Sequence, residues 1–180
     1  MVPTESLPDP AAGPPSFRQC IQPSTPTDPM PRIRISQSRS IPAPASLLYD
    51  VIADYKTGHP SILPTRYFGP LDVLAGGRGA GTTIRFAMKA FGRINVATAE
   101  ISEPVPGKEL RETLSSGIVT TFLVEPRGPT TTMVTITTEY SKPGLRGWLE
   151  RVLATSYLRR VYVAELDQLA RVGADRHRVS

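Results

Sequence analysis

The stretch Gly144 to Arg171, GLRGWLERVLATSYLRRVYVAELDQLAR, decides the fold of this chain. It contains no proline, follows the breaker Pro143-Gly144 and is followed by Gly173, which is the usual punctuation of a helix. At ~1.5 Å per residue this helix would run roughly 40 Å, longer than an ordinary globular helix. A helix of that length needs a large surface to pack on, so the rest of the chain must supply one.

One face of the predicted helix is apolar. At 100° per residue, one stripe holds Leu145, Trp148, Val152, Ser156, Val163, Leu166 and Ala170. Arg159 falls inside the same stripe, so the predicted buried face has a polar break. A second apolar set lies further round the helix and consists of Leu149, Leu153, Tyr157 and Val161. Either other elements cover this second set or it forms the contact of a homodimer.

Length and composition limit the class of protein. The chain has 180 residues and 39% hydrophobic content, which suit a single domain with a real core. No run of about 18 apolar residues occurs, and we expect neither an integral membrane segment nor a secretory signal. The single Cys20 excludes an internal disulfide, which fits a reducing compartment, so we predict a cytoplasmic protein. Two histidines and one cysteine are too few for the usual zinc site, and we predict no metal and no cofactor.

The formal net charge is +5, and it is unevenly distributed. Residues 1–30 hold three acidic side chains and one basic one, so the remainder carries 20 basic and 13 acidic side chains, a net +7. Such a surface can attract anionic ligands, membranes or nucleic acid. The basic residues are scattered, however, and no nucleic-acid motif with interleaved aromatics occurs. We therefore expect a solvated basic surface and no nucleic-acid partner.

The first 30 residues have a different composition from the rest. Nine of the chain's 19 prolines lie at or before position 31, mixed with Ser, Thr, Gly and Ala. Because such a segment cannot bury enough apolar surface to order itself, we predict a disordered extension over 1–30, a domain over 31–173 and a disordered tail over 174–180. Met30 opens the patterned part, so it is either the true or an alternative start. The intact mass of the native protein tests this hypothesis.

The middle of the chain reads as one strand, a helical segment and then many strands. Residues 32–41 alternate apolar and polar, and residues 44–55 form a short amphipathic helix, with one further helical turn at 61–63. Six strands follow, separated by Gly- and Pro-containing turns, at 65–74, 82–90, 93–102, 110–114, 118–124 and 131–140. The GGRGAG segment at 76–81 lies between strands and lacks the lysine of a phosphate loop.

Short strands at close spacing predict an antiparallel meander of about seven strands, which curls and is covered on its concave side by the long helix. A single helix about 10 Å wide does not fill a wide curled sheet. We therefore expect a cavity between the two, of the kind that binds small, largely apolar molecules.

This order of elements resembles the helix-grip superfamily SRPBCC, which contains START lipid-transfer domains, birch-pollen-allergen-like proteins and polyketide cyclases/dehydrases. The similarity covers Arg32 to Val172, and within the superfamily it is greatest to the polyketide cyclase/dehydrase and lipid-transport type. The segments that carry it are IPAPASLLYDVIADY (41–55), GPLDVLAGGRGAGTTIRFAM (69–88), ISEPVPGKEL (101–110), FLVEP (122–126), TTTMVTITTEY (130–140) and the final helix. These are structural motifs. The resemblance implies an α+β helix-grip fold and no shared catalytic signature.

Strand parity and the helix stripe predict the residues that line the cavity. They are Ile84, Phe86, Met88, Phe122, Val124, Val134, Ile136, Trp148, Val152, Ser156, Arg159 and Val163. Arg159 is either a cationic anchor for a ligand oxygen or a side chain that reaches solvent at the stripe edge, and the second interpretation is favoured because arginine is seldom buried. His59 and Tyr49 are possible polar site residues. His59 can act as a general acid or base at the cavity mouth, but a structural His-Pro turn is the favoured interpretation because no partner is evident from spacing.

Three functional hypotheses follow. The leading one is a carrier or sequestering protein for a hydrophobic small molecule, lipid or polyketide-like. The second is an enzyme of the cyclase/dehydrase type, in which the cavity folds a reactive chain and His59, a tyrosine or Arg159 assists enolisation. The third is a protein-interaction module of the co-chaperone type that uses the outer helix face. No nucleophile, base and orienting group can be grouped from the sequence, which favours binding over catalysis.

Overall fold

The computed structural model describes residues 32–141 and 147–179, with side-chain surroundings for 32–140 and 155–178. The predicted extension over 1–30 and the Met30 start lie outside this range. The described elements are β1 (Arg32–Ile41), α1 (Ala45–Ala53), α2 (Gly58–Ile62), β2 (Phe68–Ala75), β3 (Thr83–Ala90), β4 (Arg93–Val105), β5 (Glu109–Leu114), β6 (Val119–Gly128), β7 (Thr131–Ser141) and α3 (Gly147–Val179).

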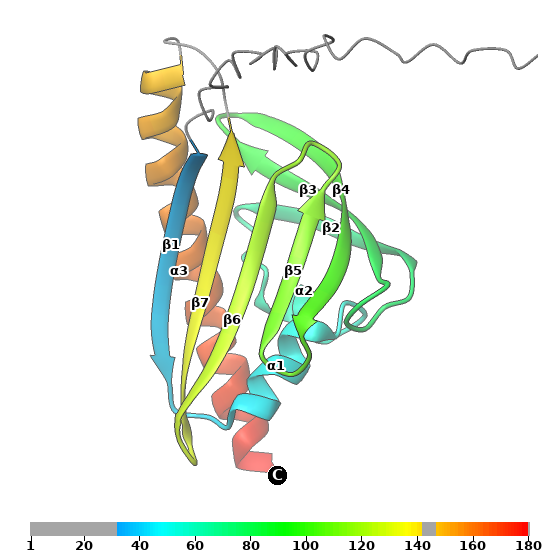
Figure 1. The fold of residues 1–180 in the computed structure, drawn as a ribbon, viewed down its shortest axis with the longest axis vertical. Helices are drawn as coiled ribbons and strands as arrows, with labels where there is room; N and C mark the ends of the chain where they lie inside the picture. Colours follow the sequence, from blue (N-terminus) through cyan, green and yellow to red (C-terminus); the bar gives the residue numbers. More distant parts are fainter. Residues whose placement is uncertain (1–31, 142–146, 180) are drawn as a thin grey trace, which may run out of the picture.

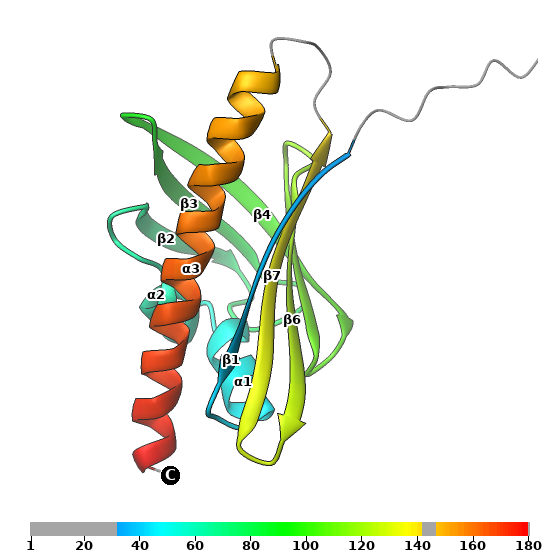
Figure 2. The same cartoon turned by 90° about the vertical axis from the view of Figure 1, so that its left-hand side faces the viewer.

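The seven strands form one antiparallel sheet in the order β1-β7-β6-β5-β4-β3-β2. Consecutive strands from β2 to β7 are neighbours, and β1 pairs with β7 over its full length, from Arg32 opposite Ser141 to Ile41 opposite Thr132. The sheet curls around α3, and α1 and α2 lie at one end of the concave face (Figures 1 and 2). The predicted α+β helix-grip fold, with a seven-strand meander and a long final helix, is confirmed.

Alternation of apolar and polar side chains sets the inner face of the sheet. Leu110 of β5 is directly opposite Phe122 of β6, which in turn is opposite Ile136 of β7, and all three are almost completely buried. Each fully buried side chain of this size contributes roughly 1.5–3 kcal/mol relative to an exposed one. The inward row therefore provides much of the free energy that holds the sheet against the helix.

The helix α3 extends further than the sequence predicted. We expected it to end at Arg171 and expected a disordered tail over 174–180, but the helix runs to Val179. Gly173 does not terminate the helix. A Cβ on this residue would lie 2.7 Å from Cδ2 of Leu48, so the glycine permits close packing of α3 on α1. The predicted helix end was wrong because Gly173 serves this close helix–helix contact and does not cap α3.

The link between α1 and α2 fixes the position of His59. The Asp54 carboxylate accepts hydrogen bonds from the backbone amides of Lys56, Thr57 and Gly58 at 3.0–3.2 Å and from the Thr57 hydroxyl. The hydrogen bond from the Thr57 side chain is the main reason that the pKa of Asp54 lies below its ordinary value. A turn held in this way begins α2 at Gly58, one residue before His59.

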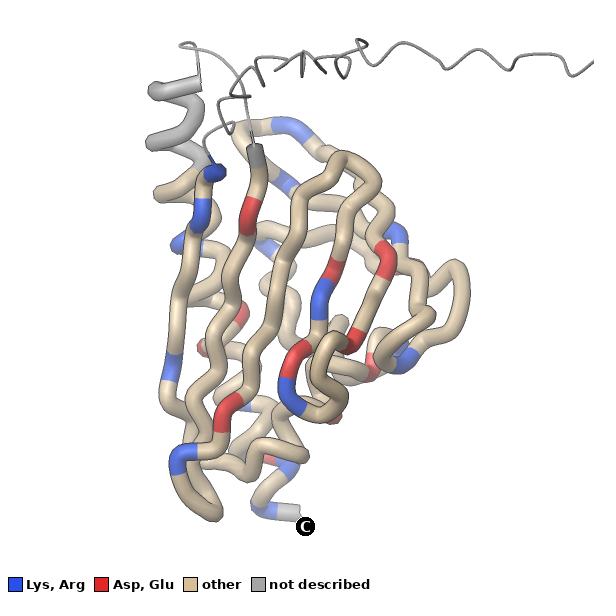
Figure 3. The backbone as a smooth tube through the Cα atoms, viewed as in Figure 1, with Lys and Arg blue, Asp and Glu red and all other residues tan. Residues whose placement is uncertain are grey.

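Charged residues are interspersed over the described chain. Lys and Arg positions and Asp and Glu positions are both spread over the strands (Figure 3). Two exposed pairs join neighbouring strands, Arg85 with Asp72 at 3.0 Å and Arg34 with Glu139 at 3.6 Å. Exposed pairs contribute little to stability. This arrangement agrees with the expected solvated surface.

Candidate functional site

A pocket of about 850 Å³ lies between α3 and the concave face of the sheet. Its wall combines strands β1, β2, β3, β5, β6 and β7 with α3, while His59 and Leu63 contribute from α2 and the residue after it. Most of the lining is apolar or aromatic. The lining includes Phe68, Phe86, Met88, Phe122, Tyr157 and Tyr162. A pocket of this size and composition is typical of small-molecule sites.

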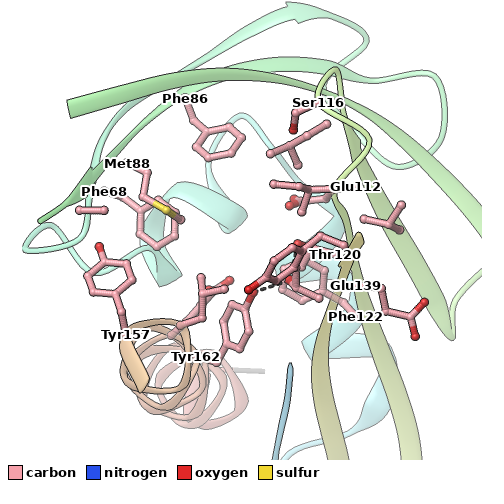
Figure 4. Close-up of a pocket in the computed structure, with 18 of the residues that line it drawn as sticks. Phe68, Phe86, Met88, Glu112, Ser116, Thr120, Phe122, Glu139, Tyr157 and Tyr162 are labelled. Atoms are coloured by element: carbon pink, nitrogen blue, oxygen red, sulfur yellow. Dashed lines mark hydrogen bonds between the residues drawn. The ribbon is translucent and has the colours of Figure 1, made fainter. Parts of the chain in front are cut away.

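Aromatic side chains form one side of the pocket. Phe86 and Met88 point inward from β3 and Phe68 from β2, and they face Tyr157 and Tyr162, which project from α3 (Figure 4). The Tyr157 hydroxyl donates a hydrogen bond to the backbone carbonyl of Lys89, which ties the helix to the β3–β4 hairpin. These surfaces provide a broad apolar contact for a ligand.

His59 is held at the pocket wall by three contacts. Its Nδ1 lies 2.7 Å from the carbonyl oxygen of Ile52, and since a carbonyl can only accept, Nδ1 must carry the proton of that bond. The ring stacks on Tyr55 at 4.4 Å between centroids and meets Phe122 edge-on at 5.5 Å. The ring orientation is thus fixed, and Nε2 faces Glu112 of β5 at 3.5 Å.

Glu112 is a carboxyl group on the inner face of the sheet, 8% exposed. Its Oε1 accepts a hydrogen bond of 2.6 Å from the Tyr55 hydroxyl and lies near Nε2 of His59. Burial, and after it the charge of Glu112, raise the pKa of Tyr55 well above its ordinary value, so this hydroxyl stays a donor. Tyr55, His59 and Glu112 form a buried polar cluster in contact with the pocket.

Glu165 is a second acid in the pocket wall and has a different environment. It lies on α3, is 3% exposed and lines the pocket. No hydrogen bond or ion pair joins it to any residue that the structure describes. Burial, and then the charge of Glu112, raise the pKa of Glu165 well above the ordinary carboxyl value. Both causes favour the neutral acid over the carboxylate at this position.

Three hydroxyl groups continue the polar part of the wall beside Glu165. Thr138 Oγ1 hydrogen-bonds the Tyr162 hydroxyl and lies 2.7 Å from Thr120 Oγ1. Tyr162 is drawn in Figure 4 with its hydroxyl directed across the pocket toward the strands. Burial is the main cause that raises the pKa of Tyr162. This chain of hydroxyls can donate to or accept from a polar group of a ligand.

The predicted residues on the sheet are all buried or half-buried on the concave side. Ile84, Phe86, Met88 and Phe122 line the pocket. Val124, Val134 and Ile136 share the same inward parity but are packed in the core and are not part of the pocket wall. Parity thus placed the side chains on the correct face.

The predicted cavity-lining residues on the helix do not line the pocket at the described positions, and for Arg159 the favoured interpretation, a side chain that reaches solvent, agrees with the structure. Ser156 and Arg159 are exposed, Val163 is 47% exposed, and none of the three lines the pocket. The helix presents a neighbouring stripe to the sheet, with Val161 and Leu169 buried and Leu158 in the pocket wall. A shift of one residue rotates the face by about 100°, and two overlapping apolar stripes made that error possible. Trp148 and Val152 lie in α3, but their side chains are outside the described range.

Two further predictions concern Tyr49 and the outer helix face. Tyr49 is buried and donates a hydrogen bond to Glu103, which also accepts one from the Ala80 amide at 2.9 Å. Tyr49 therefore belongs to the packing of the 76–81 segment and not to the pocket.

Val161 and Tyr157, predicted toward the outer face of the helix, point inward. The inward orientation of these two removes part of the surface on which the dimer and co-chaperone hypotheses rested.

Sequence patterns did not single out either acid. Glu112 lies between Leu110 and Leu114 in an alternating strand, and Glu165 lies four residues after Val161 and four before Leu169. In each case a carboxyl group occupies a position where the pattern of buried residues calls for an apolar side chain. This mismatch is visible in the sequence once the buried face of the strand or helix is known. His59 was named, and its partners became evident only in the fold.

A curled antiparallel sheet that encloses a pocket under a long C-terminal helix defines the class as a helix-grip protein. The family model for "Polyketide cyclase / dehydrase and lipid transport" matches residues 32–173, and the chain belongs to this family. The comparison with curated proteins gave no match.

Solved structures resemble the whole described domain. The solution structure of KanY protein (ms6282) has a TM-score of 0.71 at 26% identity, over 81% of this chain and 99% of that chain. The Zhui aromatase/cyclase from Streptomyces sp. R1128 has a TM-score of 0.65 at 18% identity, over 81% and 95%. Norcoclaurine synthase from Thalictrum flavum has a TM-score of 0.63 at 19% identity, over 81% and 88%. The similarity to the last two proteins concerns the fold alone.

Two further tests concern membranes and metals. Across the described ranges, no helix is both long and apolar enough to cross a membrane. In the same ranges, no group of three or more His, Cys, Asp or Glu side chains is arranged to hold a metal ion.

Proposed function

We propose that this protein binds a hydrophobic small molecule, lipid or polyketide-like, in the pocket under α3 and acts as its carrier or sequesters it. The observation that carries the proposal is the pocket itself, about 850 Å³ with a mainly apolar and aromatic wall. Membership of a family described by cyclisation, dehydration and lipid transport supports the same class of ligand. A cytoplasmic location is part of the proposal and rests on the single cysteine.

Native mass spectrometry after mild purification is the direct test. A co-purified mass that is released on denaturation supports the carrier function. Binding of a neutral apolar dye, Nile red, provides a second measurement that needs no natural ligand. Absence of both a co-purified mass and dye binding overturns the proposal.

A matched pair of variants locates the dye. Met88→Trp adds bulk inside the pocket, whereas Val96→Trp adds the same side chain at a position that is 66% exposed on the neighbouring strand. We expect Met88→Trp to reduce Nile red affinity at least fivefold and Val96→Trp to leave it unchanged. Equal effects of the two variants would place the dye elsewhere.

A second function, a cyclase/dehydrase-type enzyme, is favoured by the cluster of Tyr55, His59 and Glu112. A base at the pocket wall can take the proton from a carbon between two carbonyl groups. The enolate carbon then forms a bond to a second carbonyl carbon of the same chain, whose oxygen takes up a proton, and later loss of water completes dehydration. In this scheme His59 or Glu112 accepts the first proton, and Glu165, whose raised pKa favours the protonated form, donates the second.

The enzyme hypothesis is tested with a linear poly-β-keto thioester as substrate. We expect cyclised product in mass-resolved chromatography with the native protein, and at least a 100-fold lower rate with Glu112→Gln. Binding of the thioester without any product above the uncatalysed background would leave the carrier function and reject the enzyme.

A further inference from the structure

The buried titratable groups in the pocket wall are not balanced in charge. Glu112 and Glu165 can each carry a negative charge, and His59 is the only buried side chain of the described wall that can carry a positive one. Tyr162 in the wall and Tyr55, which lies behind it and is bonded to Glu112, stay hydroxyl donors because burial raises the pKa of both. Arg32 and Glu139 also line the pocket, but Arg32 is exposed and Glu139 is paired with Arg34 at the edge of the sheet.

The one buried side chain of the described wall that can take a positive charge is already engaged. Nε2 of His59 faces Glu112 at 3.5 Å, and its Nδ1 is bonded to the Ile52 carbonyl. Glu165 has no such partner among the described residues, although it lines the pocket and is almost completely buried. Among its buried and described side chains, the wall thus has two acids for one base, and the acid without a described partner lines the space that a ligand would fill.

We propose that the pocket binds the basic nitrogen of an apolar amine against Glu165, with Glu112 as the second acid that attracts it, and that it discriminates against carboxylate ligands. This inference rests on the proposed binding function and specifies the class of ligand. An ammonium group at this point gives Glu165 a charge-assisted hydrogen bond, which a neutral alcohol cannot match. A carboxylate cannot form this ion pair. It would add a second negative charge near Glu112, whose charge already disfavours ionisation of Glu165, and no free buried cation of the described wall offsets it.

Arg159 does not provide the alternative polar anchor. The sequence allowed a cationic anchor at Arg159 but favoured a side chain that reaches solvent, and Arg159 is indeed exposed. The charged group that α3 contributes to the pocket wall is the acid Glu165. Burial and the charge of Glu112 favour the protonated form of Glu165, and that form costs less to keep buried than a carboxylate does.

The test uses three ligands that share one rigid apolar body. They are naphthalen-2-ylmethylamine, naphthalen-2-ylmethanol and 2-naphthoate, measured with the full chain by isothermal titration calorimetry at pH 7. We expect the amine to bind at least tenfold more tightly than the alcohol and the carboxylate to bind at least tenfold more weakly. In Glu165→Gln the amine should lose at least tenfold in affinity, while the alcohol should change less than threefold.

A matched control uses an acid outside the pocket. Glu100 is an exposed residue of β4, and Glu100→Gln removes the same charge without touching the wall. We expect this variant to keep the full preference for the amine. Unchanged affinity for the alcohol in Glu165→Gln shows that the pocket is intact. A lost preference for the amine in that variant is then due to removal of the Glu165 carboxyl group.

Each outcome decides between the two proposals. If the alcohol binds as tightly as the amine in the native protein, the inference is overturned and the binding function stands. If the amine preference persists in Glu165→Gln, the assignment to Glu165 is wrong. If none of the three ligands and no Nile red bind, the proposed function fails and the inference fails with it.

Discussion

Glu165→Gln should change how the stability of the protein depends on pH. The folded-state pKa of Glu165 is raised above its unfolded value by burial and by Glu112, so the folded state holds a proton that the unfolded state releases. The stabilisation is fully present below the unfolded value near 4.5 and is lost as pH rises through the folded pKa. In Glu165→Gln the side chain cannot titrate, so the free energy of unfolding of this variant does not fall with pH for this reason.

The magnitude follows from proton linkage. Between the two pKa values the folded state holds up to one extra proton, so the native protein loses up to about 1.4 kcal/mol per pH unit relative to Glu165→Gln. For a domain of this size, 1 kcal/mol corresponds to roughly 2–4 °C in Tm. The difference in Tm between the two proteins should therefore change by roughly 3–6 °C per pH unit above pH 5.

Urea unfolding at pH 5, 6 and 7, followed by circular dichroism, measures the free energies directly. Glu100→Gln is the matched control, because the Glu100 side chain is exposed on the outer face of the sheet. Its free energy of unfolding should differ from that of the native protein by the same amount at all three pH values. If the curves of native protein and Glu165→Gln run parallel from pH 5 to 7, Glu165 has an ordinary pKa, and the description of its environment is wrong.

Two further variants probe the supports of the site. In Gly58→Ala the new Cβ would lie 2.4 Å from the backbone oxygen of Val51, so we expect a loss of about 1–3 kcal/mol in urea unfolding, whereas Gly128→Ala, with open space around its Cβ, should change little. Equal values for the two glycines would contradict the close approach of α2 to α1. In Tyr55→Phe the 2.6 Å bond to Glu112 is removed and the acid is left with one partner, so we expect a loss of about 1–3 kcal/mol at pH 7; a change below about 0.5 kcal/mol would mean that water replaces the hydroxyl without penalty.

The sheet was predictable because its signals are local. Alternation indicates the strands, and Gly- and Pro-containing turns separate them. Parity alone is sufficient to assign residues such as Phe86 and Phe122 to the concave face, where both line the pocket. The existence of a pocket follows from the geometry of one helix against a curled sheet.

The helix face was less predictable because two apolar stripes overlap on α3. Arg159 and Val163 belong to one of them, and Leu158 and Tyr162 to the other, one residue earlier. Local sequence does not choose between them. The choice depends on which residues fit the sheet, a property of tertiary packing that periodicity cannot supply.

The polar site depended on contacts between distant parts of the chain. His59 and Glu112 are 53 positions apart in the sequence, and only the packing of α2 against β5 brings Nε2 and Oε1 to 3.5 Å. Glu165 joins them from the last helix. Spacing alone therefore could not supply the partners of His59, although each acid interrupts an apolar repeat.

The close packing at Gly173 divides α3 into two parts with different freedom to vary. Around Gly173 the helix is wedged against Leu48, Ala43 and Ile41, so substitutions there disturb the assembly of the domain. Tyr157, Leu158 and Glu165 lie about two to four turns earlier, where the helix borders the pocket. Substitutions on those earlier turns can change which ligand binds best, while the tightly packed end around Gly173 keeps the fold. This helix is therefore the natural place to engineer altered ligand selectivity.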